Sequence, residues 1–236
     1  MTFNTQHCRN YIKDFIDYDI MAEAIRTCGA DIVGLNEIRD LGEDPDYYGP
    51  QLKELSERTG LPYFYFAEAI RFDGGKNPYG NGILSKYPLR DLKTVPIPDP
   101  PMEGRNPKGY YETRCLLCAT ADIGDSELAL RISHFGLNTD EQASAVSTVI
   151  GTLPNEKCVV MGDFNSHSDD PVLVPLYDRL TDTAQATGLT KLSFPSDNPW
   201  EKIDYIFVTP DIEIKEADIP EIIASDHRPH TVTVSI

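Results

Sequence analysis

Apolar residues recur along the chain with two periodicities, which predict a mixture of helices and strands. Helical spacing predicts helices over 17–28 and 48–59, and a third that begins at the capping sequence Thr139-Asp140-Glu141-Gln142. Alternating or continuous apolar runs predict strands over 2–4, 31–36, 63–66, 80–85, 89–95, 115–122, 127–134, 158–161, 203–208, 212–217 and 230–235. The segment 96–113 carries five prolines and is predicted to be an irregular loop.

Strands mixed with a few well-spaced helices favour an α+β fold in which sheets pack face to face with helices outside. No internal repeat, low-complexity tract or linker divides the sequence. We therefore expect one domain over residues 1–236.

Composition narrows the cellular setting only slightly. No apolar run approaches the roughly 18 residues needed to span a bilayer. The first residues show no apolar leader, which favours a cytoplasmic protein, although a removed leader would allow a secreted or periplasmic one. Five cysteines form an odd set, which argues against a disulfide framework. Cys115 and Cys118 fall on opposite faces of a predicted strand, so we expect core positions rather than a metal site.

Charge argues against one class of partner. The net charge is −17, whereas proteins that hold duplex DNA usually present basic surfaces, so extended duplex DNA is an unlikely partner. Residues 71–114 differ, with eight Lys and Arg against five Asp and Glu. This local excess is either a solvated loop or a small positive lip for a phosphorylated substrate.

Four separated apolar runs each carry a carboxylate at an end, at Glu37, Asp163, Asp204 and Asp226. A carboxylate taken from water without a partner costs several kcal/mol, roughly. Four such groups are best tolerated if they converge and share a cation. Mg²⁺ and Mn²⁺ prefer oxygen ligands and often also bind phosphate, so the pattern indicates metal-dependent phosphoryl chemistry.

The order of these motifs resembles the endonuclease/exonuclease/phosphatase superfamily. The matching segments are Thr2-Phe3-Asn4, Asn36-Glu37, Tyr79-Gly80-Asn81-Gly82-Ile83-Leu84-Ser85, Glu112-Thr113-Arg114, Ser133-His134-Phe135-Gly136-Leu137, Gly162-Asp163-Phe164-Asn165, Ile203-Asp204-Tyr205-Ile206-Phe207 and Ser225-Asp226-His227-Arg228-Pro229. The resemblance covers nearly the whole chain. It implies a four-layer αββα sandwich of the DNase I type, with two mixed sheets and a site at one end of them.

The resemblance also implies a set of metal ligands. Glu37 would be a primary ligand of Mg²⁺ or Mn²⁺, Asp226 another, and Asn4 would ligate or orient the metal. The family often carries an acidic residue where this chain has Gln6, so occupancy of a second metal stays open. Asn81 would order loops and ligands around this centre.

Further roles follow from the same resemblance. Asp163 would orient the attacking water, while Asn165 and His134 would hold the phosphoryl group. Arg114 would lie behind these residues and help to order them. Asp204 shares a strand face with apolar residues, so it needs a partner, and we expect it to orient His227 and keep it protonated.

Other polar residues have less context. Arg105, Lys108, Tyr110 and Tyr111 lie in the proline-rich loop and are candidates for substrate contact. His167 and His230 are more simply structural, and His7 is close enough in sequence to Asn4 to reach the site.

The sequence favours a metal-dependent phosphoesterase that acts by direct in-line attack of water on a small or short substrate. One alternative is a nuclease acting on DNA or RNA ends or on abasic DNA. Another is a phosphate-binding module without catalysis, which the completeness of the motif residues argues against. The sequence leaves the substrate, the number of metals and the oligomeric state open.

Overall fold

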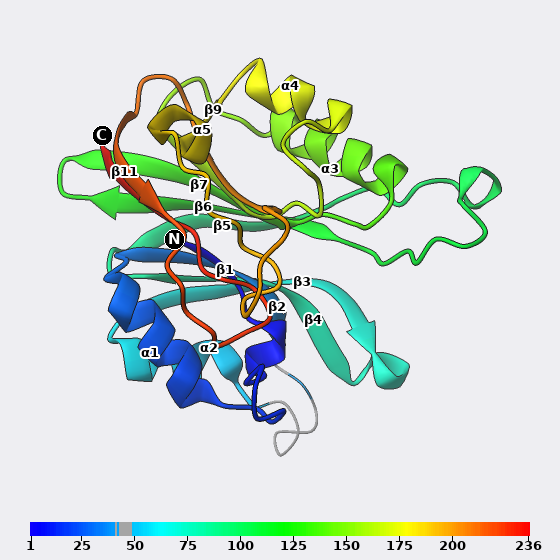
Figure 1. Ribbon diagram of the computed structural model, residues 1–236, viewed down its shortest axis with the longest axis horizontal. Coiled ribbons are helices and arrows are strands. Elements are labelled where there is room, and N and C mark those ends of the chain that lie inside the picture. Colours follow the sequence, from blue (N-terminus) through cyan, green and yellow to red (C-terminus); the bar gives the residue numbers. More distant parts are fainter. Residues whose placement is uncertain (41, 43–48) are drawn as a thin grey trace.

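Two large sheets pack face to face in the computed structural model, which describes residues 1–40, 42 and 49–236 (Figure 1). The first sheet has the strand order β1-β2-β4-β3 and contains β1 (Thr2–Asn4), β2 (Ile32–Arg39), β3 (Tyr63–Phe72) and β4 (Asn77–Ser85). The second has the order β5-β6-β7-β8-β10-β9 and contains β5 (Leu89–Pro96), β6 (Cys115–Ile123), β7 (Ser126–His134), β8 (Cys158–Asp163), β9 (Thr181–Asp182) and β10 (Asp204–Val208). A separate hairpin pairs β11 (Glu213–Asp218) with β12 (Thr231–Ser235).

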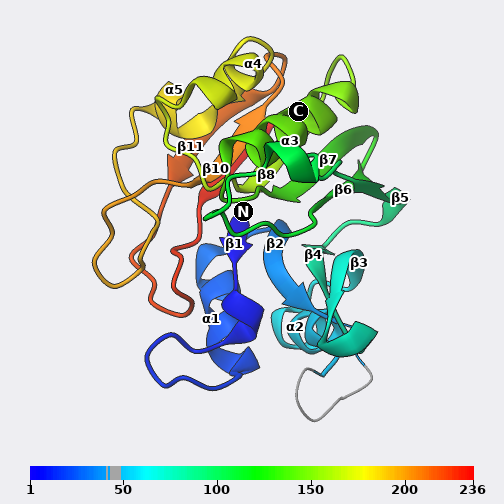
Figure 2. The same cartoon turned by 90° about the vertical axis from the view of Figure 1, so that its right-hand side faces the viewer.

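Both large sheets are mixed. The β1–β2 and β7–β8 pairs are parallel, and the other neighbouring strands run antiparallel. Helices α1 (Tyr18–Cys28) and α2 (Gln51–Thr59) cover the outer face of the first sheet (Figure 2). Helices α3 (Thr139–Gly151), α4 (Val174–Tyr177) and α5 (Thr183–Thr187) lie over the second. The predicted four-layer αββα sandwich is confirmed.

Three apolar clusters separate the four layers. One lies between α1, α2 and the first sheet, and a second lies between α3, α4 and the second sheet. The third fills the space between the sheets and includes Ile83, Ile132, Met161 and Ile206. Cys115 belongs to this inner cluster and Cys118 to the α3 cluster, so the two cysteines lie on opposite faces of β6. All five cysteines are free thiols, which agrees with the argument against a disulfide framework.

The helices and strands follow the predicted pattern with local corrections. Asp17 caps α1 by accepting the Ile20 N–H at 3.1 Å, and Gly29 ends the helix with a φ of 62°. The cap of α3 is one residue earlier than predicted, because Glu141 accepts the backbone N–H of Asn138 at 3.2 Å. Residue 48, the expected start of α2, lies outside the described residues.

Sequence periodicity underestimated the long β3–β4 hairpin, and it missed the short elements between 162 and 202. Strand β3 runs to Phe72 instead of ending near residue 66, since its backbone stays paired with β4 through a bulge. The missed elements are α4, β9, α5 and the 3-10 helix Pro171–Leu173. Other 3-10 helices lie at Gln6–Cys8, Asp73–Gly75 and Met102–Gly104. None of the described helices has the length and apolar character needed to cross a membrane.

Candidate active site

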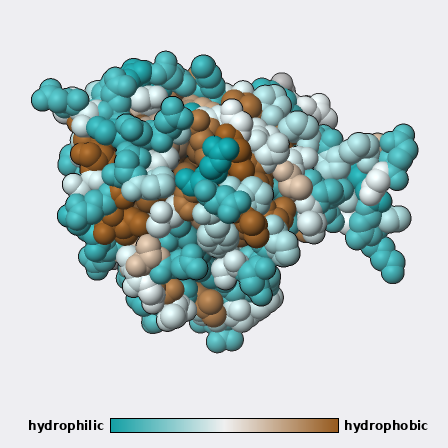
Figure 3. All heavy atoms as spheres, turned by 90° about the horizontal axis from the view of Figure 1, so that it is seen from above, coloured by the Kyte–Doolittle hydropathy of each residue, from teal (hydrophilic) through white to brown (hydrophobic). Residues whose placement is uncertain are grey.

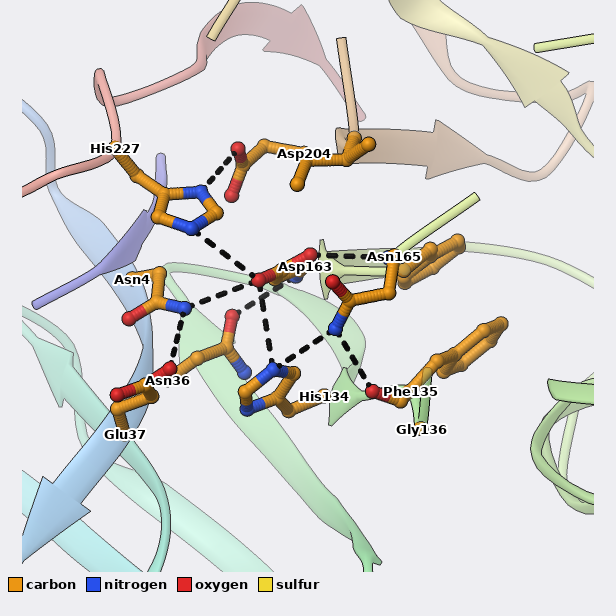
Figure 4. A network of polar contacts seen from close by, with 12 residues as sticks. Asn4, Asn36, Glu37, His134, Phe135, Gly136, Asp163, Asn165, Asp204 and His227 are labelled. Carbon is orange, nitrogen blue, oxygen red and sulfur yellow. Dashed lines mark hydrogen bonds and ion pairs between the residues drawn. The ribbon is translucent and has the colours of Figure 1, made fainter. Parts of the chain in front are cut away.

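Strand register brings three of the predicted residues together. Within the second sheet, Asp163 is paired directly with His134 on β7 and with Asp204 on β10. Within the first sheet, Asn4 is paired with Asn36. Residues directly opposite each other in a sheet share a face, so these side chains meet at one end of the sandwich (Figure 4).

A β-bulge in β2 places Glu37 at this end. The register of β2 against β4 shifts between Leu35 and Ile38, and Glu37 has a φ of 59°. A bulge re-aims one side chain relative to a regular strand. The Glu37 carboxylate therefore faces the site, where its Oε1 accepts a hydrogen bond from Asn4 Nδ2 at 3.1 Å.

Asn36, the residue before Glu37, links four strands. Its Nδ2 donates to Asn81 Oδ1 at 2.7 Å and to the carbonyl of Ser133 at 3.0 Å. Its Oδ1 accepts the backbone N–H of Asp163 at 2.9 Å. Asn36 is fully buried, so it ties the two sheets together directly beneath the site. The sequence reading quoted Asn36 in a motif but assigned it no role.

The Asp163 carboxylate lies at the centre of the polar network. Its Oδ2 accepts from Asn4 Nδ2 at 3.0 Å, and its Oδ1 accepts the backbone N–H of Asn165 at 3.0 Å. Ring nitrogens of His134 and His227 lie 3.4 and 3.5 Å from Oδ2. Burial raises the pKa of Asp163 to about 7, although the charge of His227 opposes that shift. This carboxyl is suited to proton exchange near neutral pH.

A glycine permits the approach of Asp163 to β7. Gly162 has a φ of 150°, and a Cβ atom there would lie 1.7 Å from the carbonyl oxygen of Ser133. Only glycine fits this close contact between parallel strands.

Asp204 and His227 form the expected buried pair. His227 Nδ1 lies 2.8 Å from Asp204 Oδ2, and both side chains are almost fully buried. Burial would lower the pKa of His227, but the carboxylates of Asp204 and Asp163 raise it to about 10. His227 is therefore an imidazolium that directs its Nε2–H toward Asp163.

His134 has a different environment on the other side of Asp163. Nη1 of Arg114 lies 3.1 Å from both His134 Nδ1 and the Tyr79 hydroxyl, and 2.6 Å from Glu112 Oε1. Burial and the Arg114 charge hold the pKa of His134 well below its usual value. Two adjacent histidines thus have opposite protonation states.

Glu37 and Asp226 form a donor set that fits a hard divalent cation. Both line the same pocket, and Asp226 is anchored by the Ser225 hydroxyl, which donates to its Oδ1 at 3.0 Å. Burial raises the pKa of Asp226, and the Glu37 charge adds to that rise. A carboxyl whose ionisation is disfavoured by burial and by a neighbouring carboxylate is stabilised by a cation that both groups can bind. Asn4 orients Glu37 through Nδ2, while its Oδ1 accepts the N–H of Gln6 at 3.1 Å.

A second acidic group is less suited to a metal. Among the described residues, Asp163, Asp204 and His227 bring potential ligand atoms within 4.8 Å of one another. The protonated His227 already bridges the two carboxylates and would repel a cation. This group is better explained as a hydrogen-bonded relay.

The site opens into a pocket of about 590 Å³. Its lining residues are His7, Glu37, Arg39, Phe72, Tyr79, Tyr110, Glu112, Arg114, His134, Leu137, Asp163, Asn165, Phe194, Glu201, Ile203, Asp226 and His227. Sequence reasoning quoted Tyr79 in a motif but gave it no role, and it missed Arg39, Phe72 and Phe194, because nothing in their local sequence marks them as part of a site. His7 does reach the site, with Nε2 3.6 Å from Glu37 Oε2.

The proline-rich loop contributes less than expected. Tyr110 lines the pocket, but Arg105, Lys108 and Tyr111 do not. Arg105 instead packs over the Tyr111 ring at 4.8 Å. The loop projects from the body with a largely hydrophilic surface in Figure 3. A part for these three residues in substrate binding stays a prediction.

The excess positive charge of residues 71–114 is dispersed rather than gathered at the pocket. Arg71 pairs with Glu68, Lys86 with Asp31, and Arg90 with Asp122. Asn81 lies beneath the site and donates to the carbonyl of Cys115 at 2.9 Å. His167 pairs with Glu201 at the surface, while His230 is buried away from the pocket lining.

Comparison with known proteins agrees with this arrangement. The model of the Endonuclease/Exonuclease/phosphatase family matches residues 1–227. No curated protein matches the sequence.

Solved structures share the fold at low sequence identity. An endonuclease/exonuclease/phosphatase from Beutenbergia cavernae superposes with a TM-score of 0.80 at 22% identity, covering 99% of this chain and 70% of the other. A protein of the same description from Bacteroides vulgatus gives 0.76 at 19% identity, covering 100% and 97%. The mannosyl-6-phosphatase Bt3783 of Bacteroides thetaiotaomicron gives 0.69 at 18% identity, covering 93% and 90%.

Proposed function

Because this chain belongs to the endonuclease/exonuclease/phosphatase family, we propose that it is a divalent-metal-dependent phosphoesterase. It hydrolyses a phosphodiester or phosphomonoester of a small or short substrate by direct in-line attack of water. Members of the family are in general hydrolases of phosphoesters. The observation that carries the proposal is the convergence of Glu37, His134, Asp163 and the Asp204–His227 pair on one pocket.

Glu37 and Asp226 would hold Mg²⁺ or Mn²⁺, with Asn4 keeping the Glu37 carboxylate in place. A cation bound there would polarise the phosphoryl group and stabilise the leaving oxygen. Gln6 leaves this centre with fewer acidic groups than a second ion would favour.

The attacking water is held and deprotonated by Asp163. This carboxylate is fixed by Asn4 and by the Asn165 N–H, so its position does not depend on the substrate. The Asp204–His227 pair supplies a fixed positive charge next to it, and Asn165 and His134 donate hydrogen bonds to phosphoryl oxygens. Donors and charges that are already in place stabilise the transition state without reorganisation.

The chemistry is tested with a panel of phosphomonoesters and phosphodiesters, together with abasic DNA and sphingomyelin, each assayed with Mg²⁺ and Mn²⁺. We expect metal-dependent hydrolysis of at least one small ester, and loss of that activity in Asp204→Asn. If the protein binds phosphate but hydrolyses none of the substrates, it is instead a binding module. Turnover confined to DNA would favour the nuclease alternative.

The cation site is tested separately by calorimetric titration with Mn²⁺. Glu37→Gln preserves the shape of the side chain and the Asn4 contact but removes the charge, so its affinity should fall at least tenfold. Glu68→Gln, which alters an exposed ion-paired glutamate outside the pocket, is the matched control. Equal affinity in the wild type and Glu37→Gln would contradict the assignment.

A further inference from the structure

Arg114 is locked in place beside His134. Its guanidinium is buried with Glu112 on one side and Tyr79 on another, and Nη1 lies 3.1 Å from His134 Nδ1. Only 8% of the Arg114 surface is exposed, so the contact cannot be exchanged readily for water.

A guanidinium can only donate hydrogen bonds, which decides the state of the imidazole. Nδ1 of His134 must accept from Arg114, so it carries no proton. A neutral imidazole then carries its single proton on Nε2. An imidazolium, or the opposite tautomer, would direct an N–H at the Arg114 N–H groups.

Nε2 of His134 meets a second donor in the pocket. The Asn165 amide is oriented by Nδ2, which donates to the Phe135 carbonyl at 3.0 Å. The same Nδ2 lies 3.1 Å from His134 Nε2. Both nitrogens carry hydrogen in this arrangement, so they cannot bond to each other. Each has an N–H left for a third atom, although His134 Nε2 also lies 3.4 Å from Asp163 Oδ2. Figure 4 shows the two side chains side by side next to Asp163.

We propose that Arg114 is a positioning residue that fixes His134 as the neutral Nε2–H tautomer, so that His134 and Asn165 form paired donors for one phosphoryl oxygen. The identity of that acceptor rests on the proposed function, whereas the tautomer does not. His134 is then a hydrogen-bond donor rather than a proton donor, and the mobile proton of the reaction belongs to Asp163.

The tautomer is measured by long-range ¹H–¹⁵N correlation spectra of the imidazole rings, with His134→Gln used to assign the signals. We expect the wild type to show unprotonated Nδ1 and protonated Nε2 at neutral pH, and this state should persist below the pH at which an ordinary histidine gains its second proton. A proton on Nδ1, or a doubly protonated ring at neutral pH, would overturn the proposal whether or not the protein is an enzyme.

Removal of the guanidinium tests its causal part. In Arg114→Met, the Glu112 carboxylate loses its cation while Tyr79, Asp163, His7 and His227 stay around the ring. His134 should then gain a second proton about 2 pH units or more higher than in the wild type. The double variant Arg114→Met/Glu112→Gln removes both charges, which keeps the experiment usable if the single variant does not fold. It should also lose the Nδ1 restraint, with a smaller rise, because the Arg114 charge that lowers the pKa of His134 is gone but no unpaired Glu112 carboxylate adds to the effect. Unchanged His134 spectra in both variants would show that Arg114 contributes only to packing.

Turnover gives an independent measurement. Loss of one preorganised donor should lower kcat of Arg114→Met by about 10²-fold with a smaller change in KM. Arg114→Lys, which can still donate a hydrogen bond to His134 Nδ1, should recover part of the lost kcat. Arg90→Met alters another ion-paired arginine, outside the pocket, and should keep wild-type kcat. Loss of turnover in Arg114→Met with a wild-type His134 spectrum would contradict the mechanism. A confirmed tautomer without hydrolysis of any phosphoester would leave this inference standing and reject the proposed function.

Discussion

At the scale of single residues, the site works by giving similar groups different environments. Asp204 is buried against His227 and keeps both nitrogens of that ring protonated. Arg114 instead keeps the His134 ring neutral, with a single proton. Asp163 lies between the two histidines and has a pKa near neutrality because of burial. The same residue types therefore provide a charge, a neutral donor and a proton acceptor within one small volume.

We predict that Asp204→Asn and His227→Ala each reduce kcat by about 10²- to 10⁴-fold. An asparagine cannot hold His227 in its charged form, and alanine removes the ring. Because the two residues act as a unit, the double variant should lose little more than the worse single variant. Steady-state kinetics of the three variants decides this, and multiplicative losses would show that the residues act separately.

His230 gives a prediction about stability and pH. Its ring is fully buried, with Nδ1 3.2 Å from the Asp204 carbonyl, and burial lowers its pKa from 6.5 to about 3. The folded pKa lies below the unfolded one, so the unfolded chain binds the proton first. This group's contribution to stability is present above pH 6.5 and is lost as the pH falls toward 3.

The measurement is urea unfolding at pH 7 and pH 5 for the wild type and His230→Gln, which retains an amide donor for the carbonyl. The wild type should lose about 2 kcal/mol more than the variant between the two pH values. His167→Gln alters an exposed histidine and is the control. An equal pH dependence in the wild type and His230→Gln would show that His230 titrates normally.

At the scale of elements, the end of β2 decides the geometry of the site. The bulge at Glu37 releases one residue from the ladder, and Asn36 uses its amide to join β4, β7 and β8. The Asn36 side chain thus links β7 and β8 of the second sheet to β2 and β4 of the first.

We predict that Asn36→Leu lowers the free energy of unfolding by about 3 kcal/mol or more, because it leaves several buried polar groups without partners. The Asp163 N–H is one of them, so turnover should fall as well. Urea unfolding measures the first effect, with Asn198→Leu as an exposed control. A loss below about 1 kcal/mol would mean that water replaces the amide.

At the scale of the whole molecule, charge limits the substrate. The net charge is −17, and three of the eight cations of 71–114, Arg71, Lys86 and Arg90, are paired with acids away from the pocket. We therefore expect a long polyanion to be repelled, whereas one or two phosphates could enter the pocket beside a cation bound there.

We predict weak binding of duplex DNA at physiological salt, with a shallow dependence on salt concentration. Fluorescence anisotropy of a labelled duplex at several salt concentrations measures both. Tight, sequence-independent binding with a steep salt slope would restore a DNA-directed function, since it requires several phosphate contacts to Lys and Arg.

The sequence alone determined the elements and the residue types of the site. Buried strands and amphipathic helices have distinct periodicities, so most of the strands and all three long helices could be predicted. The polar residues at strand ends, such as Glu37 and Asp163, were identifiable because a carboxylate at the end of a buried apolar run is costly unless it has a partner. Short elements such as α4 and α5 escaped, because four or five residues carry too little periodicity.

The tertiary structure alone decided which atoms meet. Strand register put His134, Asp163 and Asp204 on neighbouring strands, and the β2 bulge turned Glu37 toward them. The contact of Arg114, just before β6, with His134 at the end of β7 depends on side-chain direction, which no sequence spacing specifies. Protonation states follow from such contacts and from burial, so the sequence could name the histidines but only the fold could assign their protons.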